Sequence, residues 1–434
     1  PPVVPSPSFT LPQETPLYRR RYRRVALLWS AAVGLLVPLY FLGIADASHL
    51  GWDFRAYHAA ARAVLHGEPF VGIDPGVPGV SYVYPPISVV LFLPQGAVGN
   101  WRVGFALQSV LNAGAALALA ALVVHTVESH RGRLPATDRL LVAGFCLGSA
   151  PALAVLGLGQ VDALVALALG GAFVALERER GGLAGVAVGG AALVKVFPIA
   201  LGLWLAWRRA WRALGAAVAT GVAGLAMGAL WFGLDAYRRY LGVLAERSRV
   251  AEFAGTVSAD FFAMSLSRPL SQALPGVDPH LYAPLGALLV APAAVLVAGR
   301  ERRSDVTDRL ATYLVAVASV LLVSPASNVL YVVYVYFPLL CLLYLDTSRR
   351  GRSLLLAGTA AIAFPVQPGH VGAALTAAGA PVALSASVAA AAREVLTVVS
   401  VPLVGLLAIL AWCSLRTVRG RRTPTVDVRA EGAD

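Results

Sequence analysis

Long apolar runs alternate with short arginine-rich loops along most of this 434-residue chain. Runs of this kind are typical of helices that cross a lipid bilayer, which need roughly 20 apolar residues each. The runs cover residues 25–44, 101–124, 140–158, 163–176, 183–207, 213–234, 281–298, 310–323, 329–345, 354–365 and 396–415. They predict an all-α polytopic integral membrane protein with about twelve transmembrane helices, if Pro198 divides the run 183–207 into two helices.

Three further stretches do not fit a simple span. The apolar piece 91–99 is too short to cross a bilayer and is interpreted as a re-entrant or interfacial element. Residues 235–250 carry Tyr237, Tyr240 and Leu241 at roughly helical spacing, which predicts an amphipathic helix at the membrane interface. The stretch 369–392 fits an outer loop, a re-entrant piece or a further span equally well.

Composition supports a membrane protein. Hydrophobic residues make up 58% of the chain and charged residues only 13%, whereas soluble domains carry roughly 25% charged residues. The net charge of +12 comes from arginines concentrated in the short loops. This distribution fits the positive-inside rule for a multi-pass protein of the cell membrane better than it fits a nucleic-acid-binding protein.

We expect three parts along the chain. Residues 1–24 form a disordered, proline-rich tail that ends in a basic anchor, residues 25–415 form a single transmembrane domain, and residues 416–434 form a cytoplasmic tail.

The predicted topology places several polar side chains, far apart in the sequence, at the non-cytoplasmic face. They are Asp53, Tyr84, Gln160, Asp162, Lys195 and Asn328. Polar groups at membrane depth are costly and usually line a cavity, so their convergence on one face indicates a functional site.

Asp53 is the strongest candidate for chemistry. It follows the first apolar run and precedes a helix-like stretch at 54–65. A carboxylate beside an apolar surface is suited to act as general base for a hydroxyl group. An aspartate in front of a helix is equally suited to cap it, and the residues alone leave both roles open.

Lys195 is the only lysine in the chain, and it lies where a proline breaks a helix. Such a lysine is suited to bind a phosphate or another anion, and the alternative is a side chain that snorkels to the interface. Tyr82 and Tyr84 are similarly open to two interpretations, an interfacial anchor or a platform on which a sugar stacks.

The remaining candidates are weaker. His58 and His66 are eight residues apart, whereas helical metal ligands are usually three or four apart, so we expect no metal site. Arg268 and the other outer-loop arginines fit contact with lipid phosphate, or simply solvated surface charge. The chain has no phosphate-binding Walker loop and no dinucleotide fingerprint, which argues against nucleotide-driven transport and against a soluble nucleotide-sugar domain.

Four segments, taken in order, resemble motifs of glycosyltransferase family 87, the membrane-embedded mannosyltransferases that use polyprenyl-phosphate mannose. They are Asp53 with the helix 54–67, Tyr-Val-Tyr-Pro-Pro at 82–86, Gly-Gln-Val-Asp at 159–162 and Lys-Val-Phe-Pro at 195–198. The resemblance covers about residues 25–346 and implies the GT-C fold for the domain 25–415. One departure occurs at 324–331, where the Trp and His of the family pattern are absent and Asn328 or Tyr331 takes their place.

The resemblance implies a mechanism in which Asp53 removes the proton from an acceptor hydroxyl on the non-cytoplasmic face. The hydroxyl then displaces a lipid phosphate from the sugar, with inversion. The donor phosphate would lie near residues Lys195, Arg55, His58 and Arg268. The substrates would be lined by Tyr82, Tyr84, Gln160, Asp162, Asn328 and Tyr331.

The implied partners are a polyprenyl-phosphate-sugar donor, a lipid-linked or glycolipid acceptor and membrane lipids, with no cofactor, metal or nucleic acid. The family indicates mannose in an α-1,2 linkage, with arabinofuranose as an alternative sugar. A transporter or lipid flippase would use a similar cavity, but transporters favour sites near the midplane between internal repeats. A noncatalytic scaffold is the third class, and the concentration of polar groups on one face argues against it.

Overall fold

The computed structural model describes residues 16–43, 49–248, 258–261, 263–299, 305–348 and 351–419. Within those residues the chain is helical, apart from loops and one isolated antiparallel bridge between Ala263 and Asn328. Residues 1–15 and 420–434, which belong to the two predicted tails, lie outside the described residues.

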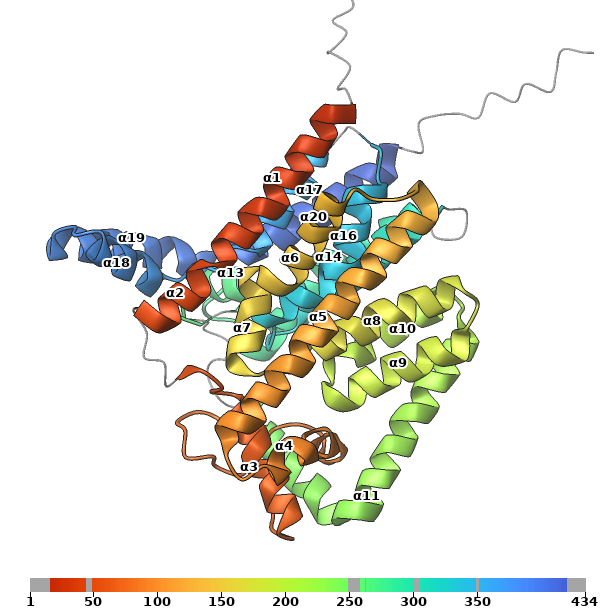
Figure 1. The fold of residues 1–434 in the computed structure, drawn as a ribbon, viewed down its shortest axis with the longest axis vertical. Helices are drawn as coiled ribbons and strands as arrows, with labels where there is room; N and C mark the ends of the chain where they lie inside the picture. Colours follow the sequence, from red (N-terminus) through yellow and green to blue (C-terminus); the bar gives the residue numbers. More distant parts are fainter. Residues whose placement is uncertain are drawn as a thin grey trace, which may run out of the picture.

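Figure 1 shows the helices as an elongated bundle with a smaller cap of short helices and loops at one end. In chain order the elements are α1 (Pro16–Gly34), α2 (Leu36–Gly43), α3 (Phe54–Leu65), η2 (Pro86–Phe92), α4 (Leu93–Ala97), α5 (Trp101–Arg131), α6 (Ala136–Gly148), α7 (Ala150–Leu158), α8 (Asp162–Glu177), α9 (Gly181–Val194), η3 (Phe197–Ala200), α10 (Leu201–Trp207), α11 (Trp211–Ser248), α13 (Ser267–Ala273), η4 (Pro279–Leu281), α14 (Tyr282–Ala298), α15 (Val306–Val323), η6 (Val329–Val335), α16 (Tyr336–Leu345), α17 (Arg352–Ile362), α18 (Pro368–Ala377), α19 (Val382–Val398) and α20 (Val401–Arg419).

The centre of the bundle is α16, all of whose residues are buried. It is apolar on every side, as expected for a helix enclosed by other helices, and it packs against α5 and α15. A second apolar cluster lies in the cap, around Phe54, Tyr57 and Phe92, and is built from α3, the 70–84 loop and η2. Gln160 and Lys195, two of the residues predicted to form a site, contact the tyrosines Tyr57 and Tyr84 of the cap.

The predicted membrane helices are confirmed in part. Among the described residues, six helices are long and apolar enough to cross a membrane, and a seventh crosses if the bent pair α6 and α7 is counted as one. These segments define a multi-pass membrane protein. The predicted total of about twelve is not confirmed by this measure, because several apolar runs, such as 183–207, form shorter helices.

The basic cluster before the first apolar run is part of α1 rather than a tail that precedes it, because α1 begins at Pro16. Three of its arginines have a partner: the buried Asp138 of α6 lies 3.6 Å from Arg20, 3.6 Å from Arg23 and 2.8 Å from Arg24. These ion pairs hold the basic cluster, as the first turns of α1, against α6. The start of α1 and the end of α20 lie at the same end of the molecule, opposite the cap (Figure 1).

Two predicted breaks occur where the sequence places them. Lys195 is extended (φ −134°, ψ 132°) and ends α9, and the short helix η3 then begins at Phe197 with Pro198 in its first turn. The apolar run 213–234 and the described part of the amphipathic stretch, 235–248, form one element, α11, that bends at Gly233 (φ 78°, ψ 161°). The ambiguous stretch 369–392 forms parts of two helices, α18 and α19, which pack on each other and project from the bundle (Figure 1).

Glycines hold α9 close to α11. A Cβ atom at Gly185 would lie 2.1 Å from the carbonyl oxygen of Ala213, and one at Gly189 would lie 2.6 Å from that of Ala217. Small residues spaced by four let helix backbones approach closely, which is a common way to pack helices in membranes. The contact anchors the helix that carries Lys195 at its end.

Candidate active site

A glycine turn brings two distant parts of the chain together. Gly159 caps α7 in the left-handed conformation (φ 73°), and a Cβ atom there would lie 2.6 Å from Cβ of Phe54. The backbone N–H of Gly51 also donates to the carbonyl of Gly157 at 2.7 Å. Only glycine satisfies both the conformation and the space, so the turn seats Gln160 against the start of α3.

Gln160 is the centre of a hydrogen-bond network. Its Nε2 donates to Oδ2 of Asp53 at 2.7 Å. Its Oε1 lies 2.7 Å from the hydroxyl of Tyr57 and 3.1 Å from that of Tyr84, and the two hydroxyls are themselves 2.7 Å apart. The side-chain amide therefore connects the carboxylate of Asp53 to a pair of tyrosines.

The carboxylate of Asp53 determines which way the amide of Gln160 points. Burial raises the pKa of Tyr57 well above its usual value and that of Tyr84 to about 12, so both remain protonated phenols. A phenol can donate or accept, but a carboxylate only accepts, so the amide must turn its N–H toward Asp53 and its oxygen is left to accept from the two hydroxyls. Nε2 is therefore held toward Asp53, where its N–H meets a carboxylate oxygen.

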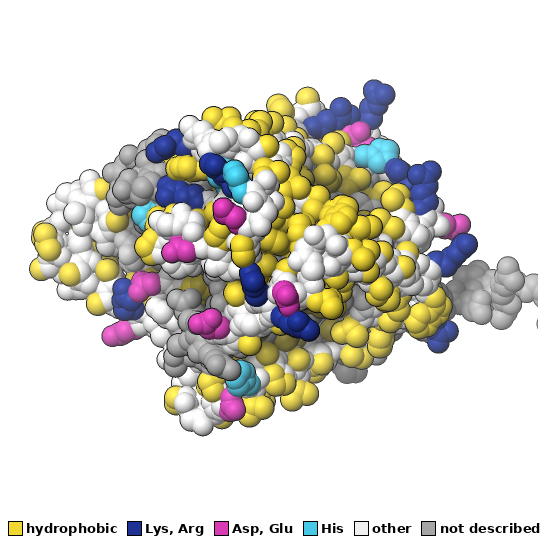
Figure 2. Space-filling view, turned by 90° about the horizontal axis from the view of Figure 1, so that it is seen from below, with side chains coloured by type: hydrophobic (Ala, Val, Ile, Leu, Met, Phe, Trp, Pro, Cys, Tyr) yellow, Lys and Arg dark blue, Asp and Glu magenta, His cyan; other side chains and the backbone are white. Residues whose placement is uncertain are grey.

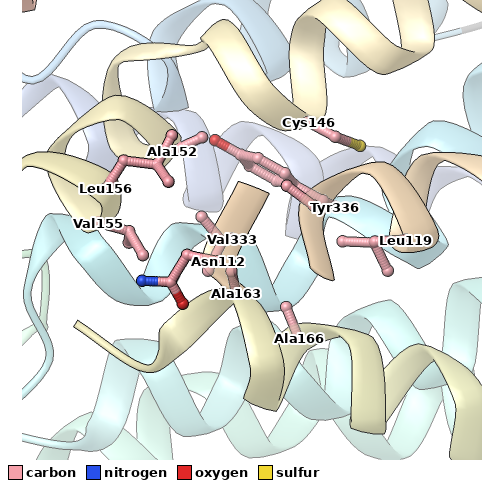
Figure 3. A pocket seen from close by; sticks show the side chains of 11 residues that line it. Asn112, Leu119, Cys146, Ala152, Val155, Leu156, Ala163, Ala166, Val333 and Tyr336 are labelled. Atoms are coloured by element: carbon pink, nitrogen blue, oxygen red, sulfur yellow. The ribbon is translucent and has the colours of Figure 1, made fainter. Parts of the chain in front are cut away.

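The backbone of the same turn is held by α5. Nδ2 of Asn112 donates to the carbonyl oxygen of Gln160 at 2.6 Å, and Asn112 in turn accepts from Gln108 at 3.4 Å. Behind Asn112 lies a cavity of about 10 Å³, lined mainly by apolar side chains of α5, α7 and α8 (Figure 3). This volume matches roughly one water molecule, so the cavity is a packing gap rather than a substrate site.

The alternative role of Asp53 as a helix cap is not what the structure shows. Asp53 occupies the N-cap position of α3, but its side chain makes no capping hydrogen bond. The carboxylate instead accepts from Gln160 across the turn.

The site has two parts, the network of Asp53 and Gln160 and an ion pair between Lys195 and Asp162. Nζ of Lys195 lies 2.7 Å from Oδ1 of Asp162, and the lysine and aspartate are 5% and 0% exposed. The hydroxyl of Tyr334 donates to the same carboxylate oxygen. Oδ2 of Asp162 is buried and has no hydrogen-bond partner among the described residues. Lys195 is therefore not a snorkelling side chain but half of a buried ion pair.

Aromatic rings join the two parts. Nζ of Lys195 lies 4.3 Å from the ring centre of Tyr331 and 5.9 Å from that of Tyr84, the tyrosine bonded to Gln160. Ring faces attract a cation, so Lys195 sits in an electron-rich enclosure. The structure thus brings together six residues predicted from the sequence, namely Asp53, Tyr84, Gln160, Asp162, Lys195 and Tyr331.

For three residues predicted to bind the donor phosphate, the structure gives contacts with other groups. Arg268 is 1% exposed and donates to the carbonyls of Ala263, Leu396 and Phe261, so it ties loops together. Nε2 of His58 lies 2.9 Å from the carbonyl oxygen of Val98. The guanidinium of Arg55 lies 4.2 Å from the ring centre of Trp101. None of these contacts involves Lys195 or Asp162.

Two predicted lining residues also have structural contacts. The Tyr82 hydroxyl lies 2.7 Å from Oγ of Ser88 inside the cap, and the ring is fully buried, so Tyr82 is neither an interfacial anchor nor an open stacking platform. Asn328 accepts from the backbone N–H of Leu330 and caps η6.

The sequence interpretation missed three members of the network, Tyr57, Asn112 and Tyr334. For two of them, helical spacing in the sequence could have indicated a place in the site. Tyr57 follows Asp53 by one turn of α3, and Tyr334 follows Tyr331 by one turn of η6, which places each beside a residue that was predicted. Asn112 lies within a long apolar helix and carried no such signal.

The class of protein follows from these features: an all-helical, multi-pass membrane protein with a carboxylate and a buried ion pair gathered beneath a cap at one end. The family model described as glycosyltransferase family 87 matches residues 82–325, which is more than half of the chain. The chain belongs to glycosyltransferase family 87, and is therefore a membrane glycosyltransferase. No match was found among curated proteins. The matched region includes Gln160, Asp162 and Lys195, and Asp53 precedes it.

The Gly159 turn gives the first prediction. Gly159→Ala should lower the free energy of unfolding by about 1–3 kcal/mol, the usual cost of overpacking, because the new methyl group meets Phe54. The thermal midpoint of the purified protein in detergent measures the loss. Gly67→Ala is the matched control, because Gly67 follows the end of α3 with the same φ (73°) and has nothing within 4 Å of the added Cβ. Equal stability of the two variants would contradict the close approach at Gly159.

Proposed function

We propose that this protein transfers a sugar from a polyprenyl-phosphate donor to a lipid-linked or glycolipid acceptor on the non-cytoplasmic side of the cell membrane. The transferred sugar is mannose in an α-1,2 linkage, arabinofuranose being the alternative, and the domain 25–415 has the GT-C architecture with about twelve spans. The observation that carries this proposal is the carboxylate of Asp53, oriented by Gln160 beside the Lys195–Asp162 pair.

Asp53 is the general base in this proposal. Its carboxylate takes the proton of the acceptor hydroxyl while the acceptor oxygen forms a bond to the anomeric carbon. The bond from that carbon to the phosphate oxygen breaks, and the lipid phosphate leaves with the bonding electron pair. One displacement inverts the anomeric configuration. Gln160 serves as a positioning residue that keeps the carboxylate in one orientation for this step.

Lys195 receives the negative charge of the donor phosphate. In the structure its charge is balanced by Asp162. When the donor binds, Nζ must therefore either move toward the phosphate or contact the phosphate and the carboxylate of Asp162 together. Oδ2 of Asp162 is buried without a described partner, and a sugar hydroxyl is the kind of group that satisfies such an acceptor. The pair would then bind the phosphate and the sugar of one donor molecule.

A transfer assay tests the proposal as a whole. Purified full-length protein is incubated with labelled polyprenyl-phosphate mannose or polyprenyl-phosphate arabinofuranose and with candidate glycolipid acceptors, and the product linkage is determined. We expect label in a glycolipid, joined by an α-1,2 mannosidic bond. Release of free sugar only, or transfer of neither sugar to any acceptor, would contradict the proposed reaction.

The second prediction concerns Asp53. Asp53→Asn should lower the rate of transfer by about a hundredfold to ten-thousandfold, the usual contribution of a general base, and should leave folding almost unchanged because the amide is of the same size. Asp74→Asn is the control, because Asp74 is an exposed acid of the same cap whose side chain, among the described residues, accepts from the N–H of Gly76 alone. A folded Asp53→Asn protein with near wild-type turnover would remove Asp53 from the mechanism.

The third prediction separates the charge of Lys195 from its structural contribution. Lys195→Ala leaves Asp162 buried without its partner and should destabilise the protein by about 3–5 kcal/mol. The double variant Lys195→Ala with Asp162→Asn removes both charges, so it should regain most of the thermal stability.

The same double variant should still fail to bind the donor phosphate. Donor KM and thermal midpoint are therefore measured together for the single and double variants. Recovery of both stability and donor KM in the double variant would show that the pair is only structural.

A further inference from the structure

A second cavity lies in the cap, away from the Gln160 network. Its volume is about 390 Å³, within the usual range of small-molecule pockets. It is formed by the segment that follows α3 and by the part of α11 around the Gly233 bend. The lining residues are Val64, Gly67, Glu68, Pro69, Phe70, Val71, Trp231, Phe232, Asp235, Ala236 and Arg239.

The lining combines aromatic rings with charged groups. Trp231, Phe232 and Phe70 offer apolar ring faces, while Glu68 and Arg239 offer an acceptor and a donor of hydrogen bonds. Neither Glu68 nor Arg239 forms an ion pair or a side-chain hydrogen bond with another described residue. Within the described part of the chain, Asp235 pairs with Arg238 alone, at 2.8 Å and on the open surface, where such a pair contributes little.

This combination fits a neutral carbohydrate. A sugar ring has an apolar face that packs on aromatic rings and a rim of hydroxyls that donate to carboxylates and accept from arginine. An anionic headgroup fits less well, because the lining carries the two acids Glu68 and Asp235 against one arginine. The carboxylates would repel a phosphate that approached Arg239.

The cavity also lies at the level where the surface changes from apolar to charged. On α11, Leu230 and Leu234 are 80% and 64% exposed, as expected for side chains that face lipid, and the exposed pair Asp235 and Arg238 follows at once. Figure 2 views the molecule from the cap end, where acidic and basic side chains are interspersed among apolar ones. A headgroup whose lipid tail lies in the membrane reaches this level.

Aromatic packing connects the cavity to the candidate active site. Phe70 contacts Phe232 on one side and Tyr82 on the other, with ring centres 5.1 and 5.8 Å apart. Tyr82 then lies 5.8 Å from Tyr84, which bonds to Gln160. From Phe70 in the cavity lining, the path to Asp53 thus runs through Tyr82, Tyr84 and Gln160. A sugar in the cavity therefore belongs to a part of the acceptor that lies away from the reacting sugar.

We propose that this cavity is a binding subsite for a non-reacting sugar in the headgroup of a glycolipid acceptor. The subsite rests on the proposed function, because it takes the reacting hydroxyl of the same acceptor to lie at Asp53. Trp231 packs on the sugar face, and Glu68 and Arg239 bond its hydroxyls.

Direct binding tests this subsite without turnover. A methyl dimannoside is added to the detergent-solubilised full-length protein, and its saturation-transfer NMR signal and dissociation constant are measured. Trp231→Ala and Glu68→Gln should each weaken binding by about fivefold or more, since losing one such contact costs roughly 1 kcal/mol. Trp211→Ala is the matched control, because Trp211 is 62% exposed at the other end of the same helix while Trp231 is 59% exposed.

The outcomes separate the subsite from the proposed reaction. Loss of binding in Trp231→Ala but not in Trp211→Ala supports the subsite, even if the protein transfers no sugar from the tested donors, a result that would contradict the proposed reaction alone. Unchanged binding in Trp231→Ala overturns the subsite and leaves the transfer reaction standing. Displacement of the dimannoside by inorganic phosphate, abolished by Arg239→Gln, overturns it in favour of an anion site.

Discussion

The hydrogen bond from the amide of Gln160 to the carboxylate of Asp53 is the contact on which the site depends. It holds one orientation because the carboxylate of Asp53 accepts only from the amide N–H, which leaves the amide oxygen to accept from the hydroxyls of Tyr57 and Tyr84. The turn that carries Gln160 is itself held by Asn112 and by a glycine that no larger residue replaces without a clash. A carboxylate that would otherwise cap a helix is thereby directed across the turn.

The buried pair of Lys195 and Asp162 places a second constraint on the fold. Two charges removed from water are costly, and their attraction offsets that cost only when the geometry is good and further hydrogen bonds are made. Tyr334 supplies one such bond and the face of Tyr331 supports the cation, yet one oxygen of Asp162 has no partner among the described residues. An incompletely satisfied pair at the end of a broken helix fits a site that completes its contacts with a ligand.

Topology explains why the sequence predicted much of this site. Arginine loops alternate with apolar runs, so the ends of those runs fall on two faces, and Asp53, Gln160 and Lys195 fall on the same one. What the sequence did not predict was the direction in which each side chain points. Arg268 has the charge expected of a phosphate ligand, but its guanidinium donates hydrogen bonds to three backbone carbonyls instead.

The count of spans was hard to predict for a related reason. Apolar composition does not distinguish a helix that faces lipid from one enclosed by other helices. α16 is enclosed on every side and is only part of a shorter apolar segment. The same ambiguity applied to 369–392, whose alanine-rich sequence fits a span but forms parts of two separate helices.

The most direct test of this account is the single-turnover rate of Gln160→Leu with saturating donor and acceptor. Leucine has a similar size but lacks the N–H that holds Asp53, so the account predicts a transfer rate lower by roughly a hundredfold, the cost of misplacing a reacting group by about 1 Å. Donor binding, which relies on Lys195, should change little. A folded Gln160→Leu protein that transfers sugar at the wild-type rate would contradict the claim that this amide positions the catalytic carboxylate.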